Sequence, residues 1–406
     1  MGGKDDLTAR EAAEELGISP ATLYAYVSRG LIHSEPGRGS SRQRRYRRAD
    51  VEGLKERQAQ RRDPSRSAET ALSWGTPVLE SAITLIEGGR LYYRGNDALQ
   101  LARSARFEDV VRLLWEIDVD TESLTLTVRH EYPERPPSSL GPLERLQMRL
   151  PLLAGADPSA YDLRPRSITR AGFTILNTFV TEIAGQPGRD DGIANTLASH
   201  LAPDIEEATR LIDAALIISA DHELNASSFT VRCVASTGAP LYDAIGAGIG
   251  ALRGVFHGAA SQRVEALLAE VDTPDDAPTI LGNRLRRGER IPGFGHQLYP
   301  EGDPRGALLL DLCHELLPGD PALHLTDAII AAAHDLIDEA PNVDFGLVAV
   351  TRVLRLEHGL ALNLMALGRT AGWVAHALEQ YEQRRMIRPR ARYVGPEPPS
   401  PSWGTD

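Results

Sequence analysis

The chain has 406 residues, of which 42% are hydrophobic and 25% are charged, as in ordinary globular proteins. This length is enough for two or three domains with a sizeable core. No uncharged apolar stretch reaches the 18 residues of a membrane span, and two cysteines are too few for a disulfide framework or a thiolate metal site. The polar start MGGKDDLTAR predicts no signal peptide, so the prior expectation is a cytoplasmic enzyme with no membrane partner.

The charge is unevenly distributed along the chain. A net charge of −12 argues against nucleic acid as a partner of the chain as a whole. Residues 1–66, however, contain 14 Lys and Arg against 10 Asp and Glu, a balance of +4, which leaves −16 for the remainder. Six arginines lie between Arg38 and Arg48 with no acidic residue among them. The first segment is therefore predicted to be a separate module.

Two short helices are predicted in this first module. The segment LTAREAAEELG has apolar residues at helical spacing and ends at Gly17, and Ser19 can cap a second helix with Pro20 in its first turn. A flexible turn, a basic run and a further helix from Ala49 follow. This order resembles the MerR-type helix-turn-helix, in which a wing follows the recognition helix. The candidates for contacting DNA phosphates or a groove are Thr22, Tyr24, Arg42, Arg44, Arg45 and Arg47. Dimerisation, or contact with another protein, is the alternative role.

Beyond a polar linker, a short β-rich segment precedes a mostly helical region. Apolar segments flank Gly88-Gly89 and predict a β-hairpin. FEDVVRLLWEI predicts an amphipathic helix, and alternation at Leu124, Leu126 and Val128 predicts a strand. From about residue 140 the pattern is nearly all helical, up to a tail over the last dozen residues.

Three titratable residues lie in short irregular stretches. His257 directly precedes a helical segment, whose dipole disfavours imidazolium and leaves a neutral hydrogen-bond donor. His296 lies among glycines that let the backbone approach a ligand, and Arg305 is suited to gripping a carboxylate. Asp344 lies in an apolar segment, where burial would raise its pKa towards that of a useful base. Each residue alone could be a cap or part of the core, and no histidine spacing indicates a metal site.

The stretches around these residues resemble the citrate synthase family in content and in order. The family signature of glycine, aromatic, glycine, histidine and DPR is matched by IPGFGHQLYPEGDPR. Supporting matches are LYYRGNDALQLARSARFEDVVRLLW, ADHELNASSFTVRCVAST, HGAAS, PNVDF, and LGRTAGWVAHALEQ with IRPRARYVG. The resemblance extends from about residue 70 to 394. It implies a mostly α-helical fold, with a large and a small helical domain that close over the substrates, preceded by the helix-turn-helix domain.

The resemblance also implies domain boundaries. These are a helix-turn-helix domain at 1–62, a linker at 63–72, the large domain at 73–262 and 353–394, the small domain at 263–352 and a tail at 395–406. It implies no metal and no permanently bound cofactor, with an acyl-CoA as cosubstrate.

By the same resemblance, the chain condenses acetyl-CoA with oxaloacetate in the tricarboxylic acid cycle. The resemblance implies that Asp344 removes a proton from the acetyl methyl group, that neutral His257 stabilises the enol, and that His296 activates the ketone of oxaloacetate. The residues expected to hold oxaloacetate are His222, Arg305 and Arg369, joined by Arg388 of a neighbouring subunit. A homodimer with shared active sites follows.

The sequence departs from the family pattern on the CoA side. Pro300 and Gln297 stand where basic residues are frequent, and Ser261 replaces an asparagine. The arginines just upstream that could compensate are Arg284, Arg286, Arg287 and Arg290. Two alternatives stay open. One is a 2-methylcitrate synthase using propionyl-CoA, since one methylene changes binding by only about 1–3 kcal/mol. The other is a DNA-binding regulator that senses oxaloacetate or an acyl-CoA through a synthase-like body.

Overall fold

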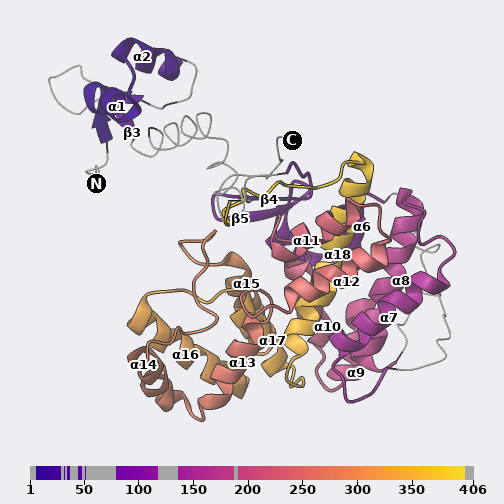
Figure 1. Cartoon of the computed structure of the whole chain (residues 1–406). Helices are drawn as coiled ribbons and strands as arrows, with labels where there is room; N and C mark the ends of the chain where they lie inside the picture. The colour runs from indigo at the N-terminus through magenta and orange to yellow at the C-terminus, as the bar shows by residue number, and fades with distance from the viewer. Residues whose placement is uncertain are drawn as a thin grey trace, which may run out of the picture. The chain divides into compact units, whose positions relative to one another are not determined.

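The computed structural model describes residues 6–28, 32, 34–36, 44–47, 51, 79–117, 136–186 and 191–397. The chain divides into two compact units, Met1–Glu80 and Ser81–Asp406, and each is described by itself (Figure 1). Among the described residues, no helix combines the length and the apolar character needed to cross a bilayer.

The first unit contains two helices and a small antiparallel sheet. Its elements are β1 (Asp6–Thr8), α1 (Ala9–Leu16), α2 (Pro20–Ser28), β2 (Ser34–Pro36) and β3 (Arg44–Arg47), with β3 in the middle of the sheet. Thr8 and Glu11 form a capping box at the start of α1, and Gly17 ends the helix with a left-handed φ of 61°. The Ser19 hydroxyl accepts a hydrogen bond from the Thr22 N–H in α2, as the cap predicted from the sequence requires.

A small core of its own holds this unit together. The buried apolar residues are Leu7, Ala12, Ala13, Leu16, Leu23, Ile32, Tyr46 and Val51. Most of them come from the two helices and the sheet, so the predicted pair of helices is confirmed, and α1 packs on β1 and β3. The helix predicted from Ala49 and the linker at 63–72 lie outside the described residues, apart from Val51.

The second unit opens with the predicted hairpin. The strands are β4 (Thr84–Glu87), β5 (Arg90–Tyr93) and β6 (Asn96–Asp97), paired antiparallel in that order. Gly88 and Gly89 form the two-residue turn with φ values of 59° and 72°. Positive φ at both positions is what a type I′ turn needs, which explains the glycine pair.

The other named elements in the described part of this unit are all helices. Their bounds are α5 (Ala98–Ser104), α6 (Phe107–Trp115), α7 (Pro142–Ala156), α8 (Pro165–Ala184), α9 (Ile193–Leu201), α10 (Ala208–Ser219), α11 (Ala226–Ala235), α12 (Leu241–Leu252), α13 (Ala260–Glu270), the 3₁₀ helix η2 (Pro274–Asp276), α14 (Ala277–Arg286), α15 (Pro304–Leu316), α16 (Pro321–Ile337), α17 (Val343–Val353) and α18 (Leu360–Gln383). The amphipathic helix predicted at FEDVVRLLWEI is α6. The strand predicted at residues 124–128 lies outside the described residues.

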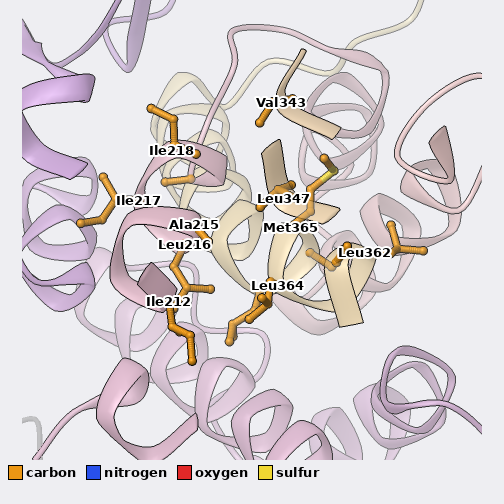
Figure 2. Packing of buried hydrophobic residues seen from close by; sticks show 14 of the residues in the cluster. Ile212, Ala215, Leu216, Ile217, Ile218, Val343, Leu347, Leu362, Leu364 and Met365 are labelled. Carbon is orange, nitrogen blue, oxygen red and sulfur yellow. The ribbon is translucent and has the colours of Figure 1, made fainter. Parts of the chain in front are cut away.

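Helices α10 and α18 form the centre of the core. Figure 2 shows Leu216 of α10, Leu347 of α17 and Leu364 of α18 within one cluster of buried hydrophobic side chains. A side chain at Gly368 or Gly372 would overlap a backbone carbonyl oxygen of the α10 region. These two glycines therefore let α18 approach α10 closely, which brings residues of both helices to one site.

Helices α13 to α17 pack mainly on one another, with α15 against α17 and α14 against α16. They contact the rest of the unit mainly through α10 and α18, and α15 also contacts α5, where Arg103 pairs with Glu315 at 2.9 Å. Gly306 of α15 faces Gly346 of α17, where an added Cβ would lie 3.0 Å from the Gly306 carbonyl oxygen. The predicted division into a large domain and a small one at residues 263–352 stays a prediction.

Candidate active site

His257 lies in the loop between α12 and α13, three residues before the first residue of α13. Its Nε2 is 3.0 Å from the hydroxyl oxygen of Ser227, to which the Trp373 indole N–H donates at 3.2 Å. Burial, together with the nearby Arg369 charge, lowers the pKa of the His257 imidazole to about 4. The ring is therefore neutral at pH 7 and can donate one hydrogen bond.

His222 and His296 stand edge to face, with ring centroids 5.2 Å apart. The Leu298 backbone N–H donates to Nδ1 of His296 at 3.2 Å, so the neutral ring carries its proton on Nε2. Burial and Arg305 lower the pKa of His296 to about 4. Burial, followed by the charges of Arg305 and Arg369, holds the pKa of His222 well below 6.5. Both rings are neutral near pH 7.

Asp344 occupies the second position of α17, just after its cap Asn342. The residue is partly exposed, but its Oδ1 is buried and makes no hydrogen bond with any described residue. A helix N-terminus favours a carboxylate. Burial nevertheless raises the pKa of the Asp344 carboxyl to about 7, against the opposing charges of Arg305, Arg263 and Arg369. The group is thus a carboxylate poised to take a proton near neutral pH.

Two buried arginines supply positive charge beside these groups. Arg305 binds Asp303 through Nε at 2.9 Å and through Nη2 at 2.8 Å. Asp303 also accepts the Val343 backbone N–H at 3.1 Å, which ties the start of α15 to the start of α17. Arg369 of α18 donates from Nε to the Ser219 carbonyl oxygen at 2.7 Å. Their charges shift the pKa values of the histidines and of Asp344, so all of these groups belong to one site.

The structure brings together six of the seven residues expected from the sequence. These are His222, His257, His296, Arg305, Asp344 and Arg369. The seventh, Arg388, is exposed in the segment after α18 and makes no hydrogen bond or ion pair with another described residue. Within the described part of the chain, no group of histidine, cysteine and carboxylate side chains could hold a metal ion.

Three further residues of the site were not anticipated from the sequence: Ser227, Tyr299 and Trp373. Ser227 contacts a histidine 30 residues away, and the Tyr299 hydroxyl lies 3.0 Å from Nε2 of His222, 77 residues away. No local pattern signals such pairs. The only hint was that all three residues lie within stretches that resemble the family, Trp373 in LGRTAGWVAHALEQ.

In the first unit, the residues predicted to contact DNA differ in how exposed they are. Tyr24 of α2 is 55% exposed, and Arg44 and Arg45 are exposed on β3. Thr22 is partly buried on α2, where its hydroxyl hydrogen-bonds to that of Ser19. The backbone of Arg47 belongs to β3, and Arg42 lies outside the described residues.

Known proteins match both parts of the chain. Residues 71–390 match the family model for the citrate synthase C-terminal domain, and residues 7–59 match the model for a helix-turn-helix domain. The chain belongs to the citrate synthase family. It is therefore an acyltransferase-type enzyme with the expected mostly α-helical fold, preceded by a helix-turn-helix domain.

Relatives within the citrate synthase family differ in their named product. Citrate synthase 2 of Bacillus subtilis is 31% identical over 359 residues, which cover 80% of this chain and 95% of that protein. 2-Methylcitrate synthase 1 of Corynebacterium glutamicum is 28% identical over 349 residues, which cover 77% and 91%. The crystal structure of citrate synthase from Thermotoga maritima aligns with a TM-score of 0.67 at 28% identity, over 79% of this chain and 94% of that one.

Proposed function

We propose that this citrate synthase family member condenses acetyl-CoA with oxaloacetate to give citrate and CoA, with Asp344 as the base. The observation that carries the proposal is the state of Asp344. Its Oδ1 is buried without a partner among the described residues, and burial raises its pKa to about 7. A methyl group next to a thioester is a weak carbon acid. The removal of a proton from it therefore needs a base that is active near neutral pH.

His257 is proposed to stabilise the enol that this proton transfer produces. The thioester oxygen only accepts hydrogen bonds, so the neutral imidazole must present an N–H to it. Since Nε2 faces Ser227, the N–H towards the substrate would be on Nδ1, with Ser227 donating to Nε2. The Trp373 N–H donates to the Ser227 hydroxyl oxygen, so the hydroxyl proton of Ser227 stays available for another acceptor. Asn225 Oδ1, at 2.7 Å, competes for that proton.

The enol carbon then attacks the ketone carbon of oxaloacetate. His296 carries its proton on Nε2, because Nδ1 accepts the Leu298 N–H, and we propose that Nε2–H protonates the ketone oxygen. His222, Arg305 and Arg369 bind the carboxylates, for which buried, permanently charged guanidinium groups are suited. Water finally hydrolyses the thioester of citryl-CoA, which releases citrate and free CoA.

The CoA side of the proposed site has few free cations. Arg284 is paired with Glu270 at 2.6 Å, and Arg287 with Glu289 at 2.6 Å. Arg286 and Arg290 are exposed and have no acidic partner among the described residues. We therefore propose Arg286 and Arg290 as the arginines of this segment available to CoA phosphates, in place of the side chains lost at Gln297 and Pro300.

The test of the proposed function is thiol release on mixing the full-length protein with oxaloacetate and either acetyl-CoA or propionyl-CoA. Release should require oxaloacetate and disappear in Asp344→Ala. Faster release with propionyl-CoA would instead assign the reaction named for the Corynebacterium relative. No release with either donor, from folded protein, would reject the enzymatic proposal.

A second role is proposed for the helix-turn-helix domain, namely binding DNA. Exposed Tyr24 on α2 and exposed Arg44 and Arg45 on β3 favour it. A gel-shift assay on the DNA upstream of its own gene, with and without oxaloacetate, tests this role. Arg44→Ala/Arg45→Ala should weaken binding and lower its salt dependence. If no complex forms at low salt, the DNA-binding and regulatory role is rejected.

A further inference from the structure

Tyr299 lies among the groups expected to hold oxaloacetate. The residue is 2% exposed, and its ring centroid is 5.6 Å from that of His222 and 5.1 Å from that of His296. The Arg305 guanidinium carbon is 5.4 Å from the centroid of the same ring. Its hydroxyl lies 3.0 Å from Nε2 of His222. The tyrosine therefore contacts all three of these side chains at once.

The protonation states of the pair are set by their surroundings. Burial raises the pKa of the Tyr299 phenol to about 12, so the hydroxyl keeps its proton. His222 is neutral, because burial and two arginines disfavour its charged form. A neutral imidazole has one nitrogen that donates and one that accepts, and the hydrogen bond at one nitrogen decides the role of the other.

The chemistry of oxaloacetate decides the direction of the hydrogen bond. The ketone and both carboxylates of its dianion accept hydrogen bonds and donate none, so His222 can bind it only through an N–H. No described residue hydrogen-bonds to Nδ1 of His222, which makes Nδ1 the nitrogen available to substrate. The proton must then be on Nδ1, and Nε2 must accept.

We propose that Tyr299 is a positioning residue for oxaloacetate binding: its hydroxyl donates to Nε2 of His222 and thereby fixes the tautomer in which Nδ1–H faces the substrate. This inference rests on the proposed function, since it assumes that the bound dianion is oxaloacetate. If the donor is lost, His222 can carry its proton on Nε2 and turn a lone pair towards a negatively charged ligand.

The test variant is Tyr299→Phe, which keeps the ring against His296 and Arg305 but removes the hydroxyl. We expect the KM for oxaloacetate to rise about tenfold, as for a lost hydrogen bond to a binding group, with kcat changed much less. The matched control is Tyr381→Phe, since Tyr381 is also buried and also makes one hydrogen bond, at 2.7 Å to the Ala239 carbonyl oxygen. The control should leave the KM within twofold of the wild-type value.

A double-mutant cycle separates action through His222 from a general structural role. In a His222→Ala background, Tyr299→Phe should add no further rise in KM, whereas independent effects would multiply. An unchanged KM in Tyr299→Phe, an equal rise in Tyr381→Phe, or multiplicative effects would overturn the inference. Oxaloacetate affinity measured by calorimetry without acyl-CoA keeps the two proposals apart. A wild-type protein that binds oxaloacetate but releases no thiol would reject the reaction, and the affinities of the variants would still test Tyr299.

Discussion

Asp344 is subject to two opposing effects at the scale of a single residue. Its place in the first turn of α17 and the charges of Arg305 and Arg369 favour the carboxylate. Removal of its Oδ1 from water favours the neutral acid, and this second effect is larger, because the pKa rises to about 7. The residue is left half ionised near neutral pH, which suits a base that must also be re-protonated during turnover.

The pH dependence of catalysis should therefore follow Asp344. The ionised fraction of a group with a pKa of about 7 rises from about a tenth at pH 6 to about nine tenths at pH 8. His257 and His296, with pKa values of about 4, stay neutral over this range. We expect kcat/KM for acetyl-CoA, at saturating oxaloacetate, to rise with an apparent pKa at or above 7.

This prediction is checked by initial rates of thiol release between pH 5.5 and 9. Free CoA added at each pH controls for the thiol detection itself. A profile that stays flat down to pH 5.5 would mean that the base has an ordinary carboxyl pKa, and Asp344 would then not be the base in the form proposed.

The same pKa shift predicts a stability effect. The unfolded chain loses the Asp344 proton near pH 3.9, whereas the folded chain keeps it up to about pH 7. The folded state therefore binds more protons between these values, so stability falls as pH rises from about 4 to 7. Asp344→Asn removes this cost. Three pKa units correspond to about 4 kcal/mol, which is an upper bound for the gain at pH 7.5.

Thermal unfolding at pH 4.5 and pH 7.5 measures the stability effect. The melting temperature of Asp344→Asn should exceed that of the wild type clearly at pH 7.5 and only slightly at pH 4.5. Asp275→Asn, at an exposed position, serves as the matched control and should show no such difference. An equal gain at both pH values would indicate better packing by asparagine rather than a raised carboxyl pKa.

At the scale of elements, the position of Asp344 depends on how closely α15 packs against α17. A Cβ at Gly306 would lie 2.5 Å from the Asn342 carbonyl carbon and 2.9 Å from the Pro341 oxygen. Both atoms belong to the backbone, which cannot turn aside as a side chain would. Asn342 caps α17 by accepting the N–H groups of Asp344 and Phe345. Movement there would shift the base directly.

Gly306→Ala should therefore cost about 1–3 kcal/mol of folding free energy and also slow thiol release. The matched control is Gly282→Ala in α14, where no atom lies within 4 Å of the added Cβ. Since alanine favours a helix over glycine, the control should be neutral or stabilised by up to about 1 kcal/mol. Melting temperatures and initial rates of thiol release, measured for both variants, test this prediction. If Gly306→Ala changed the melting temperature and the rate no more than Gly282→Ala does, the α15–α17 contact would tolerate a methyl group.

At this scale, a feature could be predicted from the sequence when the residues that cause it are close together in the chain. Gly17 and the Gly88-Gly89 pair act on their own backbone conformation, so the helix end and the hairpin turn could be predicted. The signature stretch identified His296 and Arg305 because it is long and contiguous. The contacts of Ser227 with His257 and with Trp373 span 30 and 146 residues, and the packing of α11 on α18 creates the second of them. Only the folded chain reveals such contacts.

At the scale of the whole molecule, the site of one chain lacks one expected residue. Arg388 is exposed in the segment that follows α18, away from any partner among the described residues. Helix α12, which precedes His257, also has an open surface at exposed Gly250, where an added Cβ would meet no atom within 4 Å. Both features favour the predicted homodimer, in which a second copy covers small residues and contributes Arg388 to its neighbour.

Mixing two inactive variants tests whether Arg388 acts across subunits. Asp344→Ala and Arg388→Ala should each abolish or strongly reduce thiol release as separate homodimers. After subunit exchange, about half of the dimers are mixed. If Arg388 acts in trans, one site of each mixed dimer has an intact Asp344 and receives Arg388 from the other chain. About a quarter of all sites, and so about a quarter of wild-type activity, should then return.

An arginine that acts within its own chain predicts the opposite result. Every site in a mixed dimer would then carry one of the two defects, and no activity would return. Exchange itself can be verified by mixing either variant with tagged wild-type protein and recovering both chains on the tag. Arg390→Ala in place of Arg388→Ala serves as the matched control, because both arginines are exposed in the same segment. If the Arg390→Ala homodimer is the inactive one and its mixture with Asp344→Ala recovers, Arg390 rather than Arg388 completes the neighbouring site.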